Sequence, residues 1–241
     1  MPISANIIAN ADDLGFSDSV NKAILKCYQE GYINSTSLMT DTPEFEATVN
    51  LVHQNPVIQN IGVHVDLAQF RPLTDFKEDF LDAHGNWDVY KTNKLLIKLS
   101  DAGKAAFAKE ISAQIERALD SKIKIVHLDS HLHLHTLPAF RKLFMVAAGR
   151  YKLKLRLAQT YNEGSYLKFY YRRYINGLVK RAGLNYAEGF ETVSRFLEYK
   201  NHSRKSVIEI MLHPDLDANG ALTDHFDDAT MKSWLGYLNE N

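Results

Sequence analysis

The sequence predicts an α/β fold of about seven mainly parallel strands. Short β-branched apolar segments alternate with stretches whose apolar residues recur at spacings of three and four, as strands and helices do. The 241 residues, 45% of them hydrophobic, suit one compact domain, which we expect to span residues 1–241. Periodicity does not distinguish an irregular barrel from an open doubly wound sheet. In both architectures function gathers at the carboxyl ends of the strands.

The first strand–loop–helix unit is predicted at the N-terminus. Residues 5–9 are apolar and β-branched, and they lead into the polar segment 10–15, Asn-Ala-Asp-Asp-Leu-Gly, which we interpret as a turn. Ser17 or Asp18 can cap the helix that follows. The first strand is therefore expected to end at two adjacent carboxylates.

Further strands and helices alternate along the rest of the chain. The predicted strands are 33–39, 57–67, 122–128, 153–158 and a final one at 207–212, with weaker candidates near Tyr186 and Thr192. Helical spacing follows Pro43, extends from 94 to 119, and resumes with Pro138 in a first helical turn. Residues 69 to about 92 are polar and aromatic without a clear period, and we interpret them as a long functional loop.

The composition excludes several classes of protein. Lys and Arg total 28 against 29 Asp and Glu, so no basic excess is present for a nucleic-acid partner. Cys27 is the single cysteine, which excludes an internal disulfide and a Cys-rich metal site. The longest apolar run, from Leu143 to Ala148, is far shorter than the roughly 20 residues of a membrane span. No signal peptide is visible, so we expect a cytoplasmic protein.

The Asp12–Asp13 pair is the first candidate for chemistry. On an extended strand adjacent side chains face opposite ways, so only a turn lets both carboxylates face one site. The alternative is an Asx-turn or a helix N-cap.

His64 is the second candidate, in the segment Ile-Gly-Val-His-Val-Asp-Leu. Alternation puts His64 and Asp66 on one face of the strand, so a structural pair of these two is the alternative to a functional histidine. Gly62 permits another backbone or a ligand to approach closely.

A histidine series between His127 and His135 points to a metal. Four histidines and Asp129 recur there at a spacing of two, and neutral imidazole is a common ligand of divalent cations. The four histidines cannot all bind one ion, so we expect some to support the ligands and a turn after Ser130 to split the set. A solvated histidine-rich loop is the alternative.

Arg156 and His213 stand at the ends of two later strands. Arg156 has apolar neighbours, so it needs a carboxylate or a bound anion as its partner. His213 is held extended by the following proline and is a candidate for proton transfer, with a structural role as the alternative for both residues.

Other polar and aromatic residues carry no such pattern. An aromatic cluster over 166–174 predicts a packed amphipathic helix, with sugar stacking or an oligomer interface as the alternatives. The remaining four histidines are expected on the surface: His53, His84, His202 and His225.

Together these segments resemble a known family. Asn10–Gly15, Gly62–His64, His127–His133, Arg156 and Met211–Pro214, in that order, are similar to the motifs of the YdjC-like carbohydrate deacetylases, the family of the chitooligosaccharide and hopanoid-associated deacetylases. The resemblance spans residues 1 to about 220. Here Asp215 follows the last motif, where the family often has glycine.

The resemblance implies a fold, a reaction and a set of roles. The fold would be an irregular (β/α) barrel akin to the polysaccharide deacetylases, and the reaction would be hydrolysis of an N-acetyl group from a sugar or oligosaccharide, with release of acetate. It implies one divalent metal ion on Asp13, His64 and His131. Asp12 would be the catalytic base, Arg156 the residue that orients it, and His213 the general acid.

Two other functions stay open at the level of sequence. One is a metal-dependent hydrolase of another bond, such as a phosphoester, which would favour two metals and further carboxylate ligands. The other is a non-catalytic carbohydrate-binding protein, for which the second carboxylate of the pair has no use. Mixed nitrogen and oxygen ligands suit magnesium, zinc, cobalt or manganese. The sequence does not indicate the oligomeric state, and a homodimer is plausible on base rates only.

Overall fold

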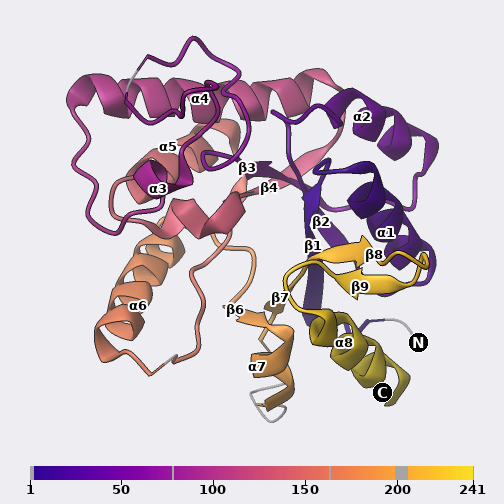
Figure 1. The fold of residues 1–241 in the computed structure, drawn as a ribbon. Helices are drawn as coiled ribbons and strands as arrows, with labels where there is room; N and C mark the ends of the chain where they lie inside the picture. Colours follow the sequence, from indigo (N-terminus) through magenta and orange to yellow (C-terminus); the bar gives the residue numbers. More distant parts are fainter. Residues whose placement is uncertain (1–2, 78, 163, 199–205, 241) are drawn as a thin grey trace.

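A seven-stranded sheet organises the computed structural model, which describes residues 3–77, 79–162, 164–198 and 206–240. Every neighbouring pair of strands in this sheet is parallel, and the order is β5-β4-β3-β2-β1-β7-β6 (Figure 1). The strands are β1 (Ile7–Leu14), β2 (Ser35–Leu38), β3 (Ile61–Val65), β4 (Ile125–Ser130), β5 (Lys154–Leu155), β6 (Gly189–Thr192) and β7 (Ile208–Leu212). The predicted class and strand number are confirmed.

The sheet curls into an irregular, incompletely closed barrel, as predicted. The two edge strands, β5 and β6, are not paired in the ladder. The segment after β5 contacts β6 instead: the Thr160 N–H donates to the Phe190 carbonyl at 3.0 Å, and the Phe190 N–H donates to the Thr160 hydroxyl at 3.2 Å. The two edges are therefore joined through this segment rather than by a strand pair.

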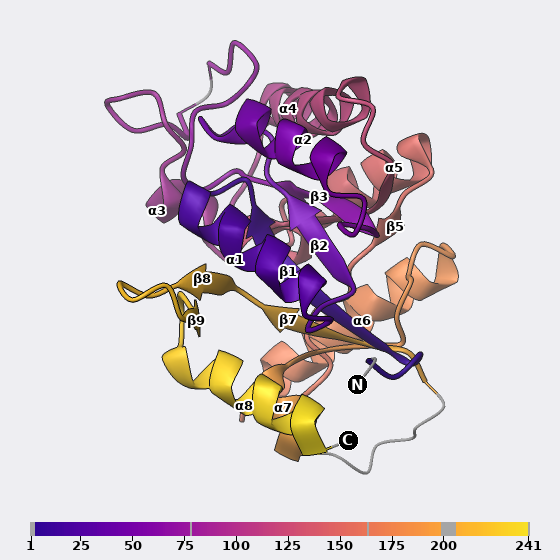
Figure 2. The ribbon, with the colours of Figure 1, turned by 90° about the vertical axis from the view of Figure 1, so that its right-hand side faces the viewer.

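Helices surround the sheet on its outside (Figures 1 and 2). They are α1 (Asp18–Gln29), α2 (Phe45–Gln54), α3 (Val89–Thr92), α4 (Asp101–Asp120), α5 (Arg141–Tyr151), α6 (Tyr166–Arg181), α7 (Val193–Glu198) and α8 (Asp228–Glu240), with the 3-10 segment η1 (His131–Thr136). The Ser17 hydroxyl caps α1 by accepting from the Val20 N–H, as one of the two predicted caps would. In the part of the chain that the structure describes, no helix is long and apolar enough to cross a membrane.

Several predicted boundaries were wrong. The strand expected over 57–67 is shortened to β3, and the one expected over 122–128 is shifted to β4. The helix expected from residue 94 begins at Asp101, because Ser100 caps it at the Gly103 N–H. The helix expected from Pro138 begins only at Arg141. The strand expected over 153–158 ends at Leu155, because further along the Ala158 N–H donates to the Asn176 side chain of α6 instead of to a strand.

A hairpin follows β7, so 207–212 is not the final strand. It pairs β8 (Pro214–Leu216) with β9 (Leu222–Asp224) in antiparallel order. Each strand has three residues, too few for alternation to be visible in the sequence. Figure 2 shows β1 and β2 running toward the side of the molecule where this hairpin and α3 lie.

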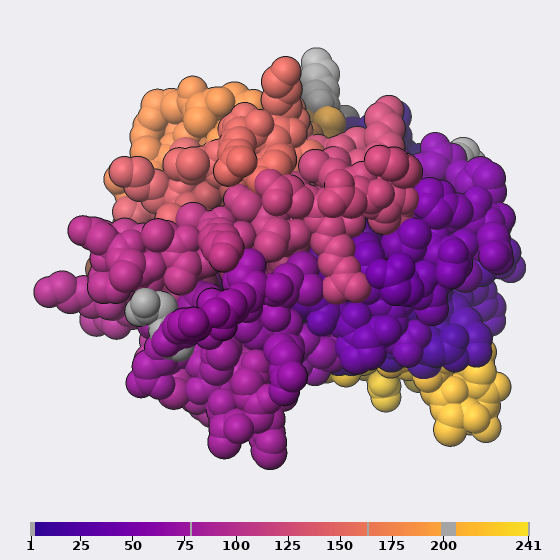
Figure 3. Space-filling view, turned by 90° about the horizontal axis from the view of Figure 1, so that it is seen from above, coloured from indigo at the N-terminus to yellow at the C-terminus, as the bar shows by residue number. Residues whose placement is uncertain are grey.

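The segment over residues 69–92 is anchored, although it has little regular structure. Two buried carboxylates hold its start: Asp66 accepts the N–H groups of residues 68–70, and Glu110 accepts those of residues 73 and 74. Further along, Trp87 packs on Phe76 and on Phe107 of α4, with ring centroids 4.6 and 5.6 Å apart. Seen from above, the segment forms a lobe beside α4 (Figure 3).

Candidate functional site

Asp12 and Asp13 lie inside β1 rather than in a turn after it, which corrects the expected strand end. The pairing of β1 with β2 shifts by one residue between Ala11 and Leu14, and Asp13 has a φ of 68°. A bulge with a left-handed residue turns the second side chain out of strict alternation. Ligand atoms of His64 consequently lie within 4.8 Å of both carboxylates. The bulge supplies the local turn that two adjacent carboxylates need.

Gly62 of β3 makes room for an imidazole. A Cβ atom placed on Gly62 would meet the ring of His127 at 2.2 Å. Because no side chain fits there, the two strands can hold a histidine ring between them. A group does approach Gly62 closely, but it is the side chain of His127 and not the expected backbone or ligand.

His64 pairs with Asp129, its register neighbour on β4, and not with Asp66. Its Nδ1 lies 2.7 Å from Asp129 Oδ1, and its Nε2 lies 3.2 Å from Asp13 Oδ1. Burial works against protonation, but the Asp129 and Asp12 carboxylates raise the pKa of His64 well above its usual value. The imidazole is thus oriented by one carboxylate and faces another.

The chain turns sharply after Ser130, as expected, and this splits the histidine series. Leu132 and His133 both have left-handed backbone angles, with φ of 51° and 56°. As a result His131 lies beside β1, where its Nδ1 is 3.0 Å from Asp13 Oδ1.

The neighbouring histidines of the series are buried and neutral. His127 Nε2 lies 3.2 Å from the Ser37 hydroxyl, and His135 Nδ1 lies 2.8 Å from the Ser130 hydroxyl. Burial lowers the pKa of His127 to about 4 and that of His135 to about 3. These contacts fit a supporting role for both rings.

One group of side chains has the donor set and the spacing of a cation site. Ligand atoms of Asp13, His64 and His131 lie within 4.8 Å of one another, and all three side chains are buried. Burial opposes ionisation of Asp13, but hydrogen bonds from the surrounding histidines hold its pKa well below the usual value. Asp13 Oδ1 is the oxygen that faces both imidazoles, 3.0 Å from His131 Nδ1 and 3.2 Å from His64 Nε2. An ionised carboxylate oxygen beside two imidazoles suits a divalent cation.

A buried guanidinium lies next to this group. Arg156 is 1% exposed, and it donates to both oxygens of Asp12 at 2.7 and 2.6 Å. It also lies 2.8 Å from Asp129 and 2.7 Å from Glu209. Burial opposes the shift, but Arg156 lowers the pKa of Asp12 and of Asp129, whereas burial raises that of Glu209 to about 7. The expected carboxylate partner of Arg156 is confirmed, and three carboxylates share it.

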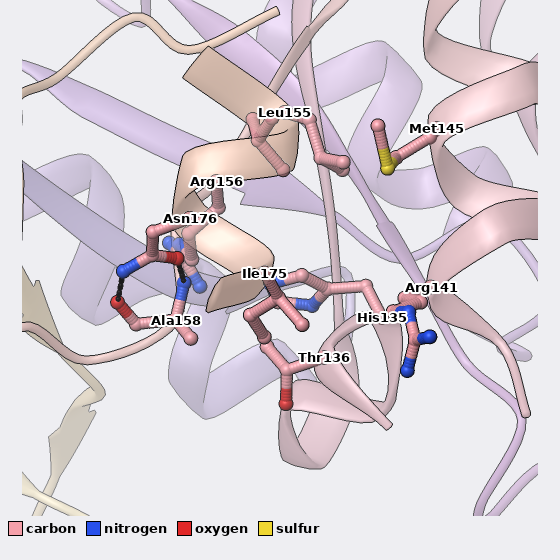
Figure 4. Close-up of a pocket in the computed structure, with 10 residues that line it drawn as sticks. His135, Thr136, Arg141, Met145, Leu155, Arg156, Ala158, Ile175 and Asn176 are labelled. Atoms are coloured by element: carbon pink, nitrogen blue, oxygen red, sulfur yellow. Dashed lines mark hydrogen bonds between the residues drawn. The ribbon is translucent and has the colours of Figure 1, made fainter. Parts of the chain in front are cut away.

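The far side of Arg156 borders a small pocket of about 10 Å³, about the room that one water molecule needs (Figure 4). His135 lines it from one side and Ile175 of α6 from another. Asn176 fixes the wall, because its side chain bonds both the N–H and the carbonyl of Ala158. Arg156 is therefore enclosed on this side by packed structure rather than by bulk solvent.

His213 comes to the site from the end of β7. Its N–H donates to Asp224 Oδ2 at 2.8 Å, and its ring packs edge-on against Phe226. Burial lowers its pKa, although the Asp12, Asp13 and Asp224 carboxylates act in the opposite direction. Asp215, which follows the motif, accepts a hydrogen bond from Ser19 of α1 and so ties the hairpin to that helix.

His225 was expected on the surface, and this was wrong. Its side chain is 18% exposed, and its Nε2 lies 3.2 Å from Asp13 Oδ2. His53 and His84 are exposed as predicted, and His202 lies outside the described residues. His225 follows a three-residue strand in a polar segment, so no local pattern identifies it.

The sequence pattern also marks Glu209 as a residue of the site. Glu209 lies between isoleucines in a strand of apolar residues, the mark of a buried charge that needs a partner. Ser37 and Asn10 lie on neighbouring strands, where Ser37 donates to Asp129 and Asn10 donates to Asp12, both at 2.7 Å.

Two adjoining hollows open over the site. One of about 310 Å³ has Asp12, His64 and His213 in its wall, with Asn93 from the end of the long loop. The second, of about 360 Å³, is lined mostly by apolar groups such as Phe16 and Val89. They share three residues: His131, Leu132 and Phe226. Four of the six predicted site residues thus line these hollows, namely Asp12, His64, His131 and His213, and residues 69–93 supply part of the wall. Asp13 and Arg156 are buried behind them, in contact with His131 and with Asp12.

The arrangement has relatives among known proteins. A family model described as YdjC-like protein matches residues 6–238. The chain is 30% identical over 209 residues to a carbohydrate deacetylase of Vibrio cholerae, covering 86% of this chain and 77% of that protein. It is 31% identical over 216 residues to a carbohydrate deacetylase of Listeria monocytogenes, covering 86% of this chain and 80% of the relative.

A solved structure shares the fold. The crystal structure of a putative cellobiose-phosphate cleavage protein from Enterococcus faecalis superposes with a TM-score of 0.71. The match covers 88% of this chain and 82% of that one, at 19% identity. The curled parallel sheet is therefore an architecture already seen in a crystal.

Proposed function

The chain belongs to the YdjC-like protein family, and we propose that it is a metal-dependent hydrolase that removes the N-acetyl group of an acetylated sugar or oligosaccharide and releases acetate. Relatives named carbohydrate deacetylase, at 30% and 31% identity over most of the chain, support the reaction. The observation that carries the proposal is the Asp13, His64 and His131 group beside an Asp12 that is held by Arg156, under one hollow.

The cation would be held by Asp13, His64 and His131. Arg156 lies on Asp12 and Asp129, at 2.6 and 2.8 Å, so Asp13 is left to the imidazoles of His64 and His131. A divalent cation bound there would replace the proton that the surrounding carboxylates favour on His64. When bound, such an ion polarises the amide carbonyl and acidifies a water molecule.

Asp12 would take the proton of the attacking water. Its Oδ1 accepts hydrogen bonds from Arg156 and Asn10, whereas Oδ2 accepts only from Arg156 in the described chain. Oδ2 therefore keeps a lone pair for the proton. Because Arg156 lowers the pKa of Asp12 in spite of its burial, the carboxylate is ionised and ready at neutral pH.

His213 would give the proton to the departing amine, which cannot leave as an anion. It lines the same hollow as Asp12, and Asp224 fixes its backbone. Since burial lowers the pKa of His213, its protonated form gives up the proton readily. Asp12 and His213 thus have separate roles as base and acid.

The hollow suits an uncharged sugar amide. No lysine or arginine is among the described residues that line the two hollows, so neither kind of side chain is there to bind a phosphate. Leu132 and Phe226 are 38% and 59% exposed at the shared wall, where apolar side chains can pack on the C–H face of a sugar ring. The volume of about 310 Å³ lies at the lower end of small-molecule sites.

A two-metal phosphoester hydrolase has less support. A second candidate group, Asp12, His64 and Asp129, shares His64 with the first. Arg156 lies on both of its carboxylates, at 2.6 and 2.8 Å, so a guanidinium already neutralises them. We therefore expect one cation per chain.

Release of acetate from N-acetylated sugars tests the proposal directly. Purified protein should release acetate and free amine in equal amounts from at least one N-acetylated mono- or disaccharide when magnesium, zinc, cobalt or manganese is added. A chelator should abolish the release, and added cation should restore it. If no sugar in the panel yields acetate with any of the four cations, the proposed reaction is wrong.

His131→Ala should lose the cation and the activity together, because it removes one of three ligand atoms. Elemental analysis gives the metal content per chain, and the acetate assay gives the activity. His53→Ala, at an exposed histidine of α2, is the control and should keep both. A His131→Ala protein with one metal per chain and full activity would contradict the ligand set.

A further inference from the structure

The short segment that follows β9 contacts both sides of the site. The His213 N–H donates to the Asp224 side chain at 2.8 Å, and the His225 N–H donates back to the His213 carbonyl at 3.1 Å. The backbone of His225 is therefore fixed to the backbone of the proposed acid. This backbone contact fixes the position from which the His225 side chain extends toward the site.

The His225 ring is held between two aromatic rings. It stacks on Phe16 with centroids 5.9 Å apart and an interplanar angle of 26°, and it packs on Phe226 at 4.4 Å. Phe16 is in turn joined to β1, since its N–H donates to the Asp13 carbonyl at 3.0 Å. These ring contacts constrain the imidazole, and its Nε2 lies 3.2 Å from Asp13 Oδ2.

The two oxygens of Asp13 face different histidines. Oδ1 lies 3.0 Å from His131 Nδ1 and 3.2 Å from His64 Nε2, and Oδ2 lies 3.2 Å from His225 Nε2. Among the described residues His225 is not part of the group whose ligand atoms lie within 4.8 Å of one another. His225 thus contacts a proposed ligand from outside the ligand group.

We propose that His225 is a positioning residue of the metal site, whose Nε2–H engages Oδ2 of Asp13 and thereby presents Oδ1 to the cation. This inference rests on the proposed function. A carboxylate that binds through one oxygen leaves coordination positions for water and for the amide oxygen, and a partner on the other oxygen is a common way to fix that mode. Asp13 is the one ligand of the three that could bind through two atoms.

Two substitutions separate the hydrogen bond from the packing. His225→Phe keeps an aromatic ring between Phe16 and Phe226 but removes the N–H. His225→Gln gives up the ring and keeps an amide nitrogen at a position comparable to Nε2. His84→Phe, at an exposed histidine, is the matched control. The readouts are the Co²⁺ dissociation constant from calorimetry and the visible absorption of the Co²⁺-loaded protein, which reports the number and geometry of its ligands.

We expect His225→Phe to weaken Co²⁺ binding by about 10–100-fold and to change the visible bands. His225→Gln should bind and absorb nearly as the unaltered protein does, and His84→Phe should match it. If His225→Phe binds and absorbs unchanged, or if His225→Gln is as impaired as His225→Phe, the positioning role is wrong. An unaltered protein that binds no Co²⁺ would instead overturn the proposed metal site itself, which distinguishes the two failures.

Discussion

Asp12→Asn is expected to lower kcat by about 10²–10⁴-fold while the protein still binds its cation. The amide cannot accept a proton from water, so the proposed base is lost. Asp12 is outside the Asp13, His64 and His131 group, so the ligand atoms remain. Parallel measurement of acetate release and of metal content on the same preparation checks the prediction.

Asp13→Asn is the matched control, because it makes the same chemical change one residue further along β1. There we expect the loss to appear in metal binding, since a neutral amide is a poorer ligand than an ionised carboxylate. Excess cation should then restore part of the activity of Asp13→Asn and none of that of Asp12→Asn. The opposite pattern would exchange the roles of the two carboxylates.

The part of the site that sequence reasoning could predict is the part set by strand ends. In a parallel sheet all carboxyl ends meet on one side, so Asp12, His64 and His131 are brought together by the alternation of elements alone. The histidine series predicts a metal site, because packing gives no reason for imidazoles to repeat at a spacing of two. That Arg156 has a carboxylate partner could be predicted, because an unpaired buried cation is costly. Which carboxylates these are could not, because all three come from distant strands.

The part that could not be predicted depends on backbone geometry and on contacts between distant segments. The bulge at Asp13 adds one residue to β1, and no residue type in the segment requires it. Strict alternation led to the wrong partner for His64, since Asp66 instead accepts the N–H groups of the loop that follows it. His225 reaches Asp13 only because a hairpin of two three-residue strands brings it back to β1.

Arg156→Met is expected to lower the free energy of unfolding of the metal-free protein by about 3–5 kcal/mol. The guanidinium is 1% exposed and lies within 2.8 Å of Asp12, Asp129 and Glu209. Methionine fills much of the same volume but leaves three acidic groups buried without their cation, on a side of the site closed by packed residues. Urea unfolding at neutral pH in the presence of a chelator measures the difference.

Two further substitutions show whether charge or volume causes the loss. Arg156→Lys keeps the charge but loses the bidentate contact with Asp12. We therefore expect a smaller loss of stability than for Arg156→Met, together with a lower kcat than that of the unaltered protein. Arg150→Met removes an exposed arginine, whose side chain is 66% accessible and 4.0 Å from Glu116, and should change stability by less than about 1 kcal/mol. If Arg156→Met unfolds at the same urea concentration as Arg150→Met, the buried carboxylates do not need the guanidinium, and Asp12 must be kept ionised by another group.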